Sequence, residues 1–432
     1  MRENKKAFGL WSAVFLGIGS MVGIGIFIVI GEAGAIAGNL VILTFLIGGI
    51  IALLAGYSLA KLSLRYPSRG GVIEFLVQEY NEGVFSGAFG VLFYLAQLIG
   101  LAAVTKSFGT YAATYISANS IDPFYVNLFA ILILTFFTII NLIGASIVAK
   151  SESLIVIIKL TALVLFVGAA LLYIKPQYFT LKDAPSIINL FYALGLVFFA
   201  YQGFSVITNS VEDLENPKKN ILRAMIISIS LVIALYVLTA IAVIGNLPLS
   251  EVIKAKDYAL AEAAKPIFGD IGFKIMAAVA LISATSAINA SLYAATQISY
   301  QLAKKGELPE IYEYNVFNST EGLIVSALLI VPMILFLNLG EIATIASIVV
   351  LIIQGFVHLG HLKKIKETNA NIILIILATI GTFGAAIFAL LYSAHKNPQI
   401  ILYVIASFIG AFLLELILRV TTKRIIKKQI SY

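Results

Sequence analysis

The sequence predicts an all-α integral membrane protein with twelve transmembrane helices. Hydrophobic residues make up 60% of its 432 residues and charged residues only 12%, and the mean hydropathy is +1.01. A soluble fold cannot bury so much apolar surface. Apolar stretches of roughly 20 residues, the length that crosses a bilayer as a helix, also recur along the whole chain.

Charged residues, glycine, proline and asparagine separate the apolar stretches and mark the predicted helix ends. The twelve predicted spans cover residues 10–37, 41–63, 83–117, 123–147, 151–174, 188–211, 219–245, 271–303, 321–338, 341–362, 371–393 and 398–420. They are expected to group into a first five-helix unit (1–174), a second five-helix unit (188–362), two additional helices (371–420) and a basic cytoplasmic tail (421–432).

The basic residues predict the orientation in the membrane. With a cytoplasmic N-terminus, 20 of the 29 lysines and arginines fall on the inner side, seven fall on the outer side, and Lys106 and Lys159 lie within spans. The positive-inside rule then predicts a multi-pass protein of the cell membrane with both termini in the cytoplasm. The net charge of +7 reflects this topology, so we expect no nucleic-acid partner. The absence of cysteine excludes thiolate catalysis and cysteine zinc sites.

The first span contains an unusual interruption, GIGSMVGIG, from Gly17 to Gly25. Glycine is less favourable than alanine in a helix by about 1 kcal/mol per residue. One interpretation is close helix packing, since Gly19 and Gly23 have the Gly-xxx-Gly spacing. The other interpretation is an unwound segment in the middle of the membrane.

The sixth span repeats this feature in VFFAYQGFSVITN, from Val197 to Asn209, where Gln202 and Gly203 interrupt an aromatic run. Met21 and Tyr201 are 180 residues apart, and each unit has five spans. Because five is odd, the second unit enters the membrane the other way up. Paired interruptions in corresponding spans of an inverted repeat indicate a transporter binding site at the bilayer midplane.

An unwound membrane helix exposes amides at the start of one half and carbonyls at the end of the other. Such groups are tolerated only where they line a cavity or meet a ligand. Amides at a helix N-terminus suit a carboxylate, and free carbonyls suit an ammonium group. A site with both is suited to a zwitterion such as an amino acid.

Several motifs together resemble those of the amino acid-polyamine-organocation transporters, which share the LeuT-like inverted-repeat fold. They are GSMVGIGIF (19–27), YPSRGG (66–71), FFAYQGF (198–204), ENPKKNILRA (215–224) and AKKGELPE (303–310). Two further segments, IIKLTALVLF and SATSAINASLYAA, resemble a proton-coupled, broad-specificity archaeal member. The resemblance implies the 5+5 repeat with spans one and six unwound, and amino acid transport.

The resemblance also implies which residues bind the substrate. The substrate carboxylate is expected at the amides of Gly23, Ile24 and Gly25. The ammonium group is expected at the carbonyls of Met21, Phe199, Ala200 and Gln202, with the Phe199 ring closing over the substrate. The Gln202 side chain either contacts substrate or bonds to neighbouring helices.

Lys159 is the expected coupling residue, because an ionisable group about nine residues into span five is a functional candidate by default. Snorkelling to the interface is the alternative. Sodium-coupled relatives use two hydroxyls that match Ser286 and Ala287, and one of these is missing here. The resemblance instead implies the Lys159 ammonium at the sodium position, near the carbonyls of Gly19 and Ser283. The coupling ion is then a proton, and no other cofactor or metal is expected.

The function predicted from the sequence is proton-coupled amino acid symport by alternating access. Sodium-coupled symport and amino acid or polyamine exchange stay open, and a channel is a more remote alternative. An enzyme is not expected, since the spans carry no catalytic histidine and carboxylate cluster. The expected partners are an amino acid and the lipid bilayer, with the protein as a monomer or homodimer. Lys106 is expected to snorkel, and His358 and His361 to lie at the cytoplasmic interface.

Overall fold

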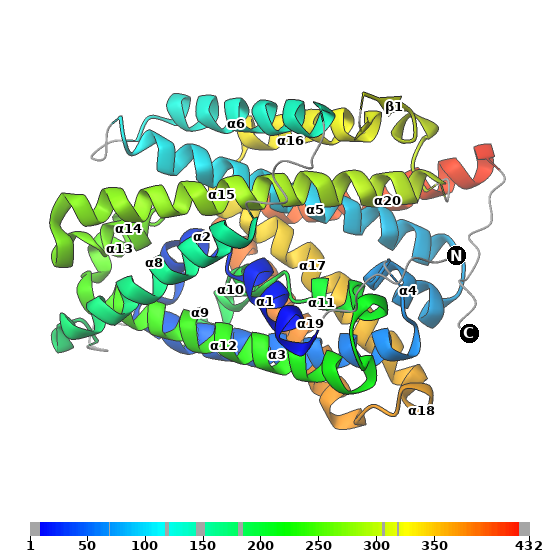
Figure 1. The fold of residues 1–432 in the computed structure, drawn as a ribbon, viewed down its shortest axis with the longest axis horizontal. Helices are drawn as coiled ribbons and strands as arrows, with labels where there is room; N and C mark the ends of the chain where they lie inside the picture. The colour runs from blue at the N-terminus through cyan, green and yellow to red at the C-terminus, as the bar shows by residue number, and fades with distance from the viewer. Residues whose placement is uncertain are drawn as a thin grey trace.

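The computed structural model describes residues 9–68, 70–116, 121–143, 152–179, 185–304, 307–317 and 319–422. The predicted tail 421–432 therefore lies outside the described residues, except for its first two. The long helices α3, α5, α12 and α15 run along the long axis of the molecule, and α6 and α16 lie together along one side (Figure 1).

The helices of the first half are α1 (Leu10–Met21), α2 (Gly25–Ala37), α3 (Val41–Arg65), α4 (Val72–Tyr80), α5 (Val84–Ala113), α6 (Pro123–Ile143) and α8 (Glu152–Leu172). The middle of the chain forms α9 (Ile188–Tyr192), α10 (Leu194–Tyr201), α11 (Val206–Asn209), α12 (Pro217–Asn246), α13 (Leu249–Lys254), α14 (Ala259–Glu262) and α15 (Lys265–Lys304). The remaining helices are α16 (Glu321–Phe336), α17 (Leu339–His361), α18 (Ile365–Thr368), α19 (Ile372–Lys396) and α20 (Gln399–Thr422).

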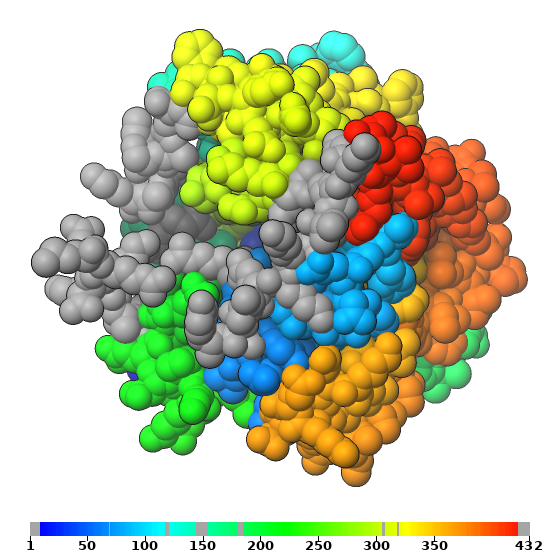
Figure 2. Space-filling model, turned by 90° about the vertical axis from the view of Figure 1, so that its right-hand side faces the viewer, coloured from blue at the N-terminus to red at the C-terminus, as the bar shows by residue number. Residues whose placement is uncertain are grey.

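A small antiparallel hairpin, β1 (Asn315–Val316) and β2 (Ser319–Thr320), precedes α16. Asn315 pairs with Thr320, and Val316 pairs with Ser319. It lies toward the end of the molecule that also carries α4 and α18 (Figure 1). Figure 2 looks onto that end, where segments from distant parts of the sequence meet.

Nine helical segments among the described residues are long and apolar enough to cross a membrane. Three further apolar helices are shorter, namely Leu10–Met21, Leu194–Asn209 and Glu321–Phe336. Each of the twelve predicted ranges contains helix. Three predicted spans are missing from this count. The interrupted first span is divided between Leu10–Met21 and the continuous segment Gly25–Arg65, the sixth span is interrupted, and α16 has only 16 residues.

Large apolar side chains cover the outward faces of the peripheral helices. On α6, Phe136, Ile139 and Ile143 are exposed, and on α8 Leu165 is exposed. Exposing such an apolar surface to water is unfavourable, whereas contact with lipid chains is not. The interior is correspondingly rich in hydrogen-bonded aromatic residues; for example, the buried Tyr201 hydroxyl donates to the Phe45 carbonyl at 2.8 Å.

A chain of buried polar side chains joins α3 to α17. The Ser58 hydroxyl lies 2.9 Å from His358 Nδ1 and 2.8 Å from His361 Nδ1, and His361 Nε2 lies 2.9 Å from the Thr368 hydroxyl. Both histidines are fully buried. The imidazoles are therefore buried inside the protein, because partners on α3 and α18 satisfy their nitrogens.

We expect Ser58→Ala to destabilise the protein by about 1–3 kcal/mol, since two buried imidazole nitrogens would lose their hydroxyl partner. The measurement is the melting temperature in detergent. Ser63→Ala is the matched control, because it removes an equally buried hydroxyl that bonds the Ala60 carbonyl of its own helix. Equal melting temperatures for the two variants would contradict this assignment.

Candidate functional site

The first helix interruption separates α1 from α2 at Val22–Ile24. Val22 leaves the helical conformation with ψ 68°, and its amide makes the last α1 hydrogen bond, to the Ile18 carbonyl at 2.7 Å. The first hydrogen bond of α2 runs from the Ile28 amide to the Ile24 carbonyl at 3.1 Å. The amides at the start of α2 consequently have no carbonyl one turn earlier in their own helix.

The second interruption follows α10. Gln202 takes an extended conformation with ψ 145°, and Gly203 has φ +118°, a value that residues with a Cβ rarely adopt. The next helical residues begin at Val206. The last carbonyls of α10 thus lie at a helix C-terminus, where the macrodipole is negative.

The two interruptions lie against each other. A Cβ at Gly25 would be 3.1 Å from Ala200 Cα, and a Cβ at Gly203 would be 2.8 Å from the Ser20 carbonyl oxygen. Only glycine allows the two backbones to come this close. The positive end of α2 therefore lies beside the negative end of α10, as a zwitterion would require.

Tyr236 of α12 contacts both interruptions, and the sequence analysis did not identify it. Its single hydroxyl proton is shared between the Met21 carbonyl at 2.7 Å and the Ala200 carbonyl at 3.1 Å. The Met21 carbonyl also accepts the Gly23 amide at 2.8 Å, and the Ala200 carbonyl has a second lone pair that can accept another donor. A tyrosine within an apolar span carries no sequence feature that reveals such a contact.

The remaining predicted substrate residues surround the same point. A Cβ at Gly23 would meet nothing within 4 Å, so there is open space beside this glycine. Ile24 is buried, and the Phe199 ring is 8% exposed. The side-chain nitrogen of Gln202 is buried with no hydrogen-bond partner among the described residues. A buried amide without a partner is costly, which makes this group available to a ligand.

The YPSRGG motif packs close to this region. Gly71, with φ +51°, approaches the end of α11, and a Cβ there would be 2.3 Å from Asn209 Oδ1. Tyr66 is buried, and its hydroxyl donates to Glu367 Oε2 at 2.6 Å. The loop between α3 and α4 thus packs against the short helix that follows the second interruption.

Lys159 lies on α8 and is only 3% exposed. Its Nζ donates to the Gly19 carbonyl of α1 at 3.0 Å. Ser283 of α15 is fully buried, and its hydroxyl has no hydrogen-bond partner among the described residues. Ser286 is buried as well. The ammonium group is therefore bonded to α1, three residues before Val22, where the first interruption begins, and does not snorkel.

Lys106 has a different environment. Its Nζ donates to the carbonyls of Ile334, at 2.7 Å, and of Leu337. These carbonyls belong to the C-terminal turn of α16, where a cation satisfies the last acceptors and the helix dipole. The expectation that Lys106 snorkels is replaced by helix capping inside the protein.

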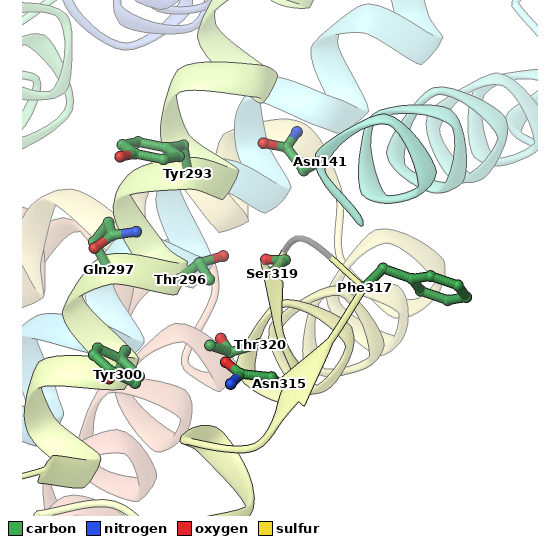
Figure 3. A pocket seen from close by; sticks show the side chains of 9 residues that line it. All are labelled: Asn141, Tyr293, Thr296, Gln297, Tyr300, Asn315, Phe317, Ser319 and Thr320. Carbon is green, nitrogen blue, oxygen red and sulfur yellow. The ribbon is translucent and has the colours of Figure 1, made fainter. Parts of the chain in front are cut away.

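A cavity of about 440 Å³ lies elsewhere, between α15, the end of α6 and the β1–β2 hairpin (Figure 3). Uncharged polar and aromatic side chains line it: Asn141, Tyr293, Thr296, Gln297, Tyr300, Asn315, Phe317, Ser319 and Thr320. None of the predicted site residues is among them. In the part of the chain that the structure describes, no three His, Cys, Asp or Glu side chains group as metal ligands.

The chain belongs to the amino acid permease family, whose family model matches residues 8–414. It is similar to an uncharacterized protein of Methanocaldococcus jannaschii, with 39% identity over 426 residues and 98% of each chain covered. It is also similar to the inner membrane transport protein YbaT of Escherichia coli, with 32% identity over 424 residues, 98% of this chain and 97% of that protein.

A more distant relative is the serine/threonine exchanger SteT of Bacillus subtilis, with 27% identity over 310 residues, 71% of this chain and 70% of that protein. The family expected from the motifs is confirmed. The protein is a multi-pass membrane transporter of the amino acid permease family and not an enzyme.

We expect Gly203→Ala to lower the free energy of unfolding by at least about 2 kcal/mol. Alanine is unfavourable at the φ of +118° found here, and its Cβ would also meet the Ser20 carbonyl. The measurement is thermal denaturation of the purified protein. Gly410→Ala is the control, since a Cβ at this helical glycine meets nothing within 4 Å. A Gly203→Ala variant as stable as the control would show that the second interruption does not need glycine.

Proposed function

We propose that this transporter carries free amino acids by alternating access and couples their uptake to protons. The observation that carries the proposal is the contact between the two helix interruptions, which brings the first amides of α2 and the last carbonyls of α10 to one place. Membership of the amino acid permease family supports the substrate class.

The substrate carboxylate would bind at the start of α2. The amides of Gly23, Ile24 and Gly25 lie at or beside the helix N-terminus, where the partial positive charge favours an anion. The open space beside Gly23 supports this assignment. Hydrogen bonds to an ionised carboxylate are about twice as strong as those between neutral groups.

The substrate ammonium group would bind at the carbonyls that end the other two half-helices, Met21 of α1 and Phe199, Ala200 and Gln202 around the end of α10. The Tyr236 hydroxyl contacts the Met21 and Ala200 carbonyls, so it would hold both in position while the Ala200 carbonyl receives the ammonium group on its other lone pair. The Met21 carbonyl also accepts the Gly23 amide at 2.8 Å, and it would receive the ammonium group once that amide turns to the substrate carboxylate. The side chains of Phe199 and Gln202 would then contact the substrate and influence which amino acids bind.

Lys159 would carry the coupling proton. In its protonated form, Lys159 makes a charge-assisted hydrogen bond to the Gly19 carbonyl and ties α8 to α1. In its neutral form this bond weakens, and α1 can separate from α8 to open the site. Separation of α1 from α8 during transport would change the surroundings of the ammonium group and release the proton.

The finer architecture belongs to the same proposal. Twelve spans would form two inverted five-helix repeats, 1–174 and 188–362, followed by α19 and α20, with both termini in the cytoplasm. The charge distribution supports this orientation. In this orientation the hairpin, α4 and α18 lie on the inner side, and α13 and α14 lie on the outer side (Figure 1).

We expect Lys159→Ala to reduce proton-driven amino acid accumulation in proteoliposomes by at least about tenfold, because the group that exchanges the proton is missing. Lys106→Ala is the matched control: it removes the other lysine within the spans but leaves the Lys159–Gly19 contact. Accumulation that survives in Lys159→Ala, or that requires sodium at constant pH in the unaltered protein, would refute proton coupling through Lys159.

We expect Gly23→Ala to raise the amino acid Kd by about tenfold, or about 1.4 kcal/mol, because its methyl group would occupy the open space beside residue 23 and displace the substrate carboxylate from the amides. The methyl group meets no protein atom within 4 Å, so the fold should tolerate it. Calorimetric titration with a panel of amino acids measures the Kd, and Gly384→Ala, also free of contacts within 4 Å, is the control. Equal affinities in both variants would count against a substrate site beside Gly23.

A further inference from the structure

At the end of the molecule opposite α4 and α18, the segment that contains α13 and α14 covers the second half of α2 (Figure 1). The contact is backbone to backbone. A Cβ at Gly31 would be 2.1 Å from the Lys256 carbonyl oxygen, and a Cβ at Gly34 would be 3.0 Å from Val252 Cγ1. Glycine at both positions therefore allows the segment to pack directly on α2.

Between these two glycines, Glu32 makes an ion pair with the covering segment. Lys256 Nζ lies 3.3 Å from Glu32 Oε1 and 3.4 Å from Glu32 Oε2. Glu32 is 7% exposed, whereas the Lys256 side chain is 42% exposed. A carboxylate this deeply buried requires a charge partner, and removing the partner is costly.

The same carboxylate also faces the first turn of α17. A Cβ at Gly340 would be 2.6 Å from Glu32 Oε1, so the carboxylate lies directly against the start of this helix. The positive end of the helix dipole stabilises a negative charge there. We call Glu32, Lys256 and the first turn of α17 the α2 clamp, because one carboxylate of α2 contacts two other elements.

Other charged groups surround the α2 clamp. Asp257 interacts electrostatically with Glu32 and Lys256, and its Oδ1 is buried without a hydrogen-bond partner among the described residues. Lys106 interacts electrostatically with Asp257 and Glu341, and Lys256 interacts with Tyr392. Lys256 is thus the cation that interacts with both Glu32 and Asp257.

We infer that the α2 clamp is a gate lock, which keeps access to the site closed on this face of the transporter. Helix α2 connects to α1 only through the non-helical residues Val22–Ile24, so α2 can move without unwinding. Opening this face requires α2 to leave the covering segment and the start of α17, and both movements break contacts of Glu32. The inference rests on the proposed alternating access and adds Glu32 and Lys256 as residues that set its conformational equilibrium.

The chain has no cysteine, so a single introduced cysteine can report on opening. Val252 lies on α13, is fully buried and faces Gly34 of α2. The thiol of Val252→Cys would therefore react with reagents in solution only when α2 separates from α13. The rate of labelling by a charged maleimide, measured on purified protein in nanodiscs without substrate, follows the population of the open state.

In the Val252→Cys background, we expect Glu32→Gln and Lys256→Gln each to raise the labelling rate by at least about fivefold, equivalent to about 1 kcal/mol. The two changes together should add little to either one, because they remove the same interaction. Lys254→Gln is the matched control: it removes a lysine at the end of α13, two residues before Lys256, and should leave the rate unchanged.

Unchanged labelling in both the Glu32→Gln and Lys256→Gln variants would overturn the inference, as would an equal increase in Lys254→Gln. If Glu32→Gln fails to fold, the more exposed Lys256→Gln decides the question alone. The assay needs neither substrate nor a proton gradient, so its result is independent of transport measurements. Faster labelling in a protein that binds no amino acid would support the gate lock and reject the proposed substrate.

Discussion

A peptide group at membrane depth must have a hydrogen-bond partner, and most of the central features of this protein follow from that requirement. Interrupting α1–α2 and α10–α11 leaves amides and carbonyls without partners inside their own helices. The structure brings these groups together, with Gly25 against Ala200 and Gly203 against Ser20. Tyr236 satisfies two of the carbonyls, and Lys159 donates to a third, at Gly19. Under the proposed function, a ligand with one anionic and one cationic end would be the partner of the groups that remain.

The same requirement explains how the helices are held to one another. Lipid chains are as apolar as leucine, so the hydrophobic effect does little to attract helices inside a bilayer. Polar side chains that cross between helices supply part of the cohesion instead. Ser58 joins α3 to the two histidines of α17, and Lys106 of α5 caps the last turn of α16. Neither contact lies at the interruptions; the Ser58 contacts are buried, and the Lys106 contact is partly buried.

The two halves of the interrupted first span have separate charged contacts. Lys159 of α8 binds α1 through the Gly19 carbonyl, and Lys256 binds α2 through Glu32. Under the proposed mechanism, these contacts act on opposite faces: releasing Lys159 frees α1, and releasing Glu32 frees α2. The non-helical residues between the half-helices would let each move while the other stays in place. This arrangement provides a physical basis for opening one face at a time.

The sequence by itself determined the membrane class, the apolar ranges, the family, the places where glycine interrupts α1–α2 and α10–α11, and the position of Lys159 within an apolar range. These features depend on local composition and spacing. Only the tertiary structure decided the roles of Tyr236, Lys106, the two buried histidines and Glu32. In lipid, the outward and inward faces of a helix are both apolar, so periodicity does not reveal which residues meet across helices. Those contacts exist only once the helices are packed, which is why the polar partners could not be predicted.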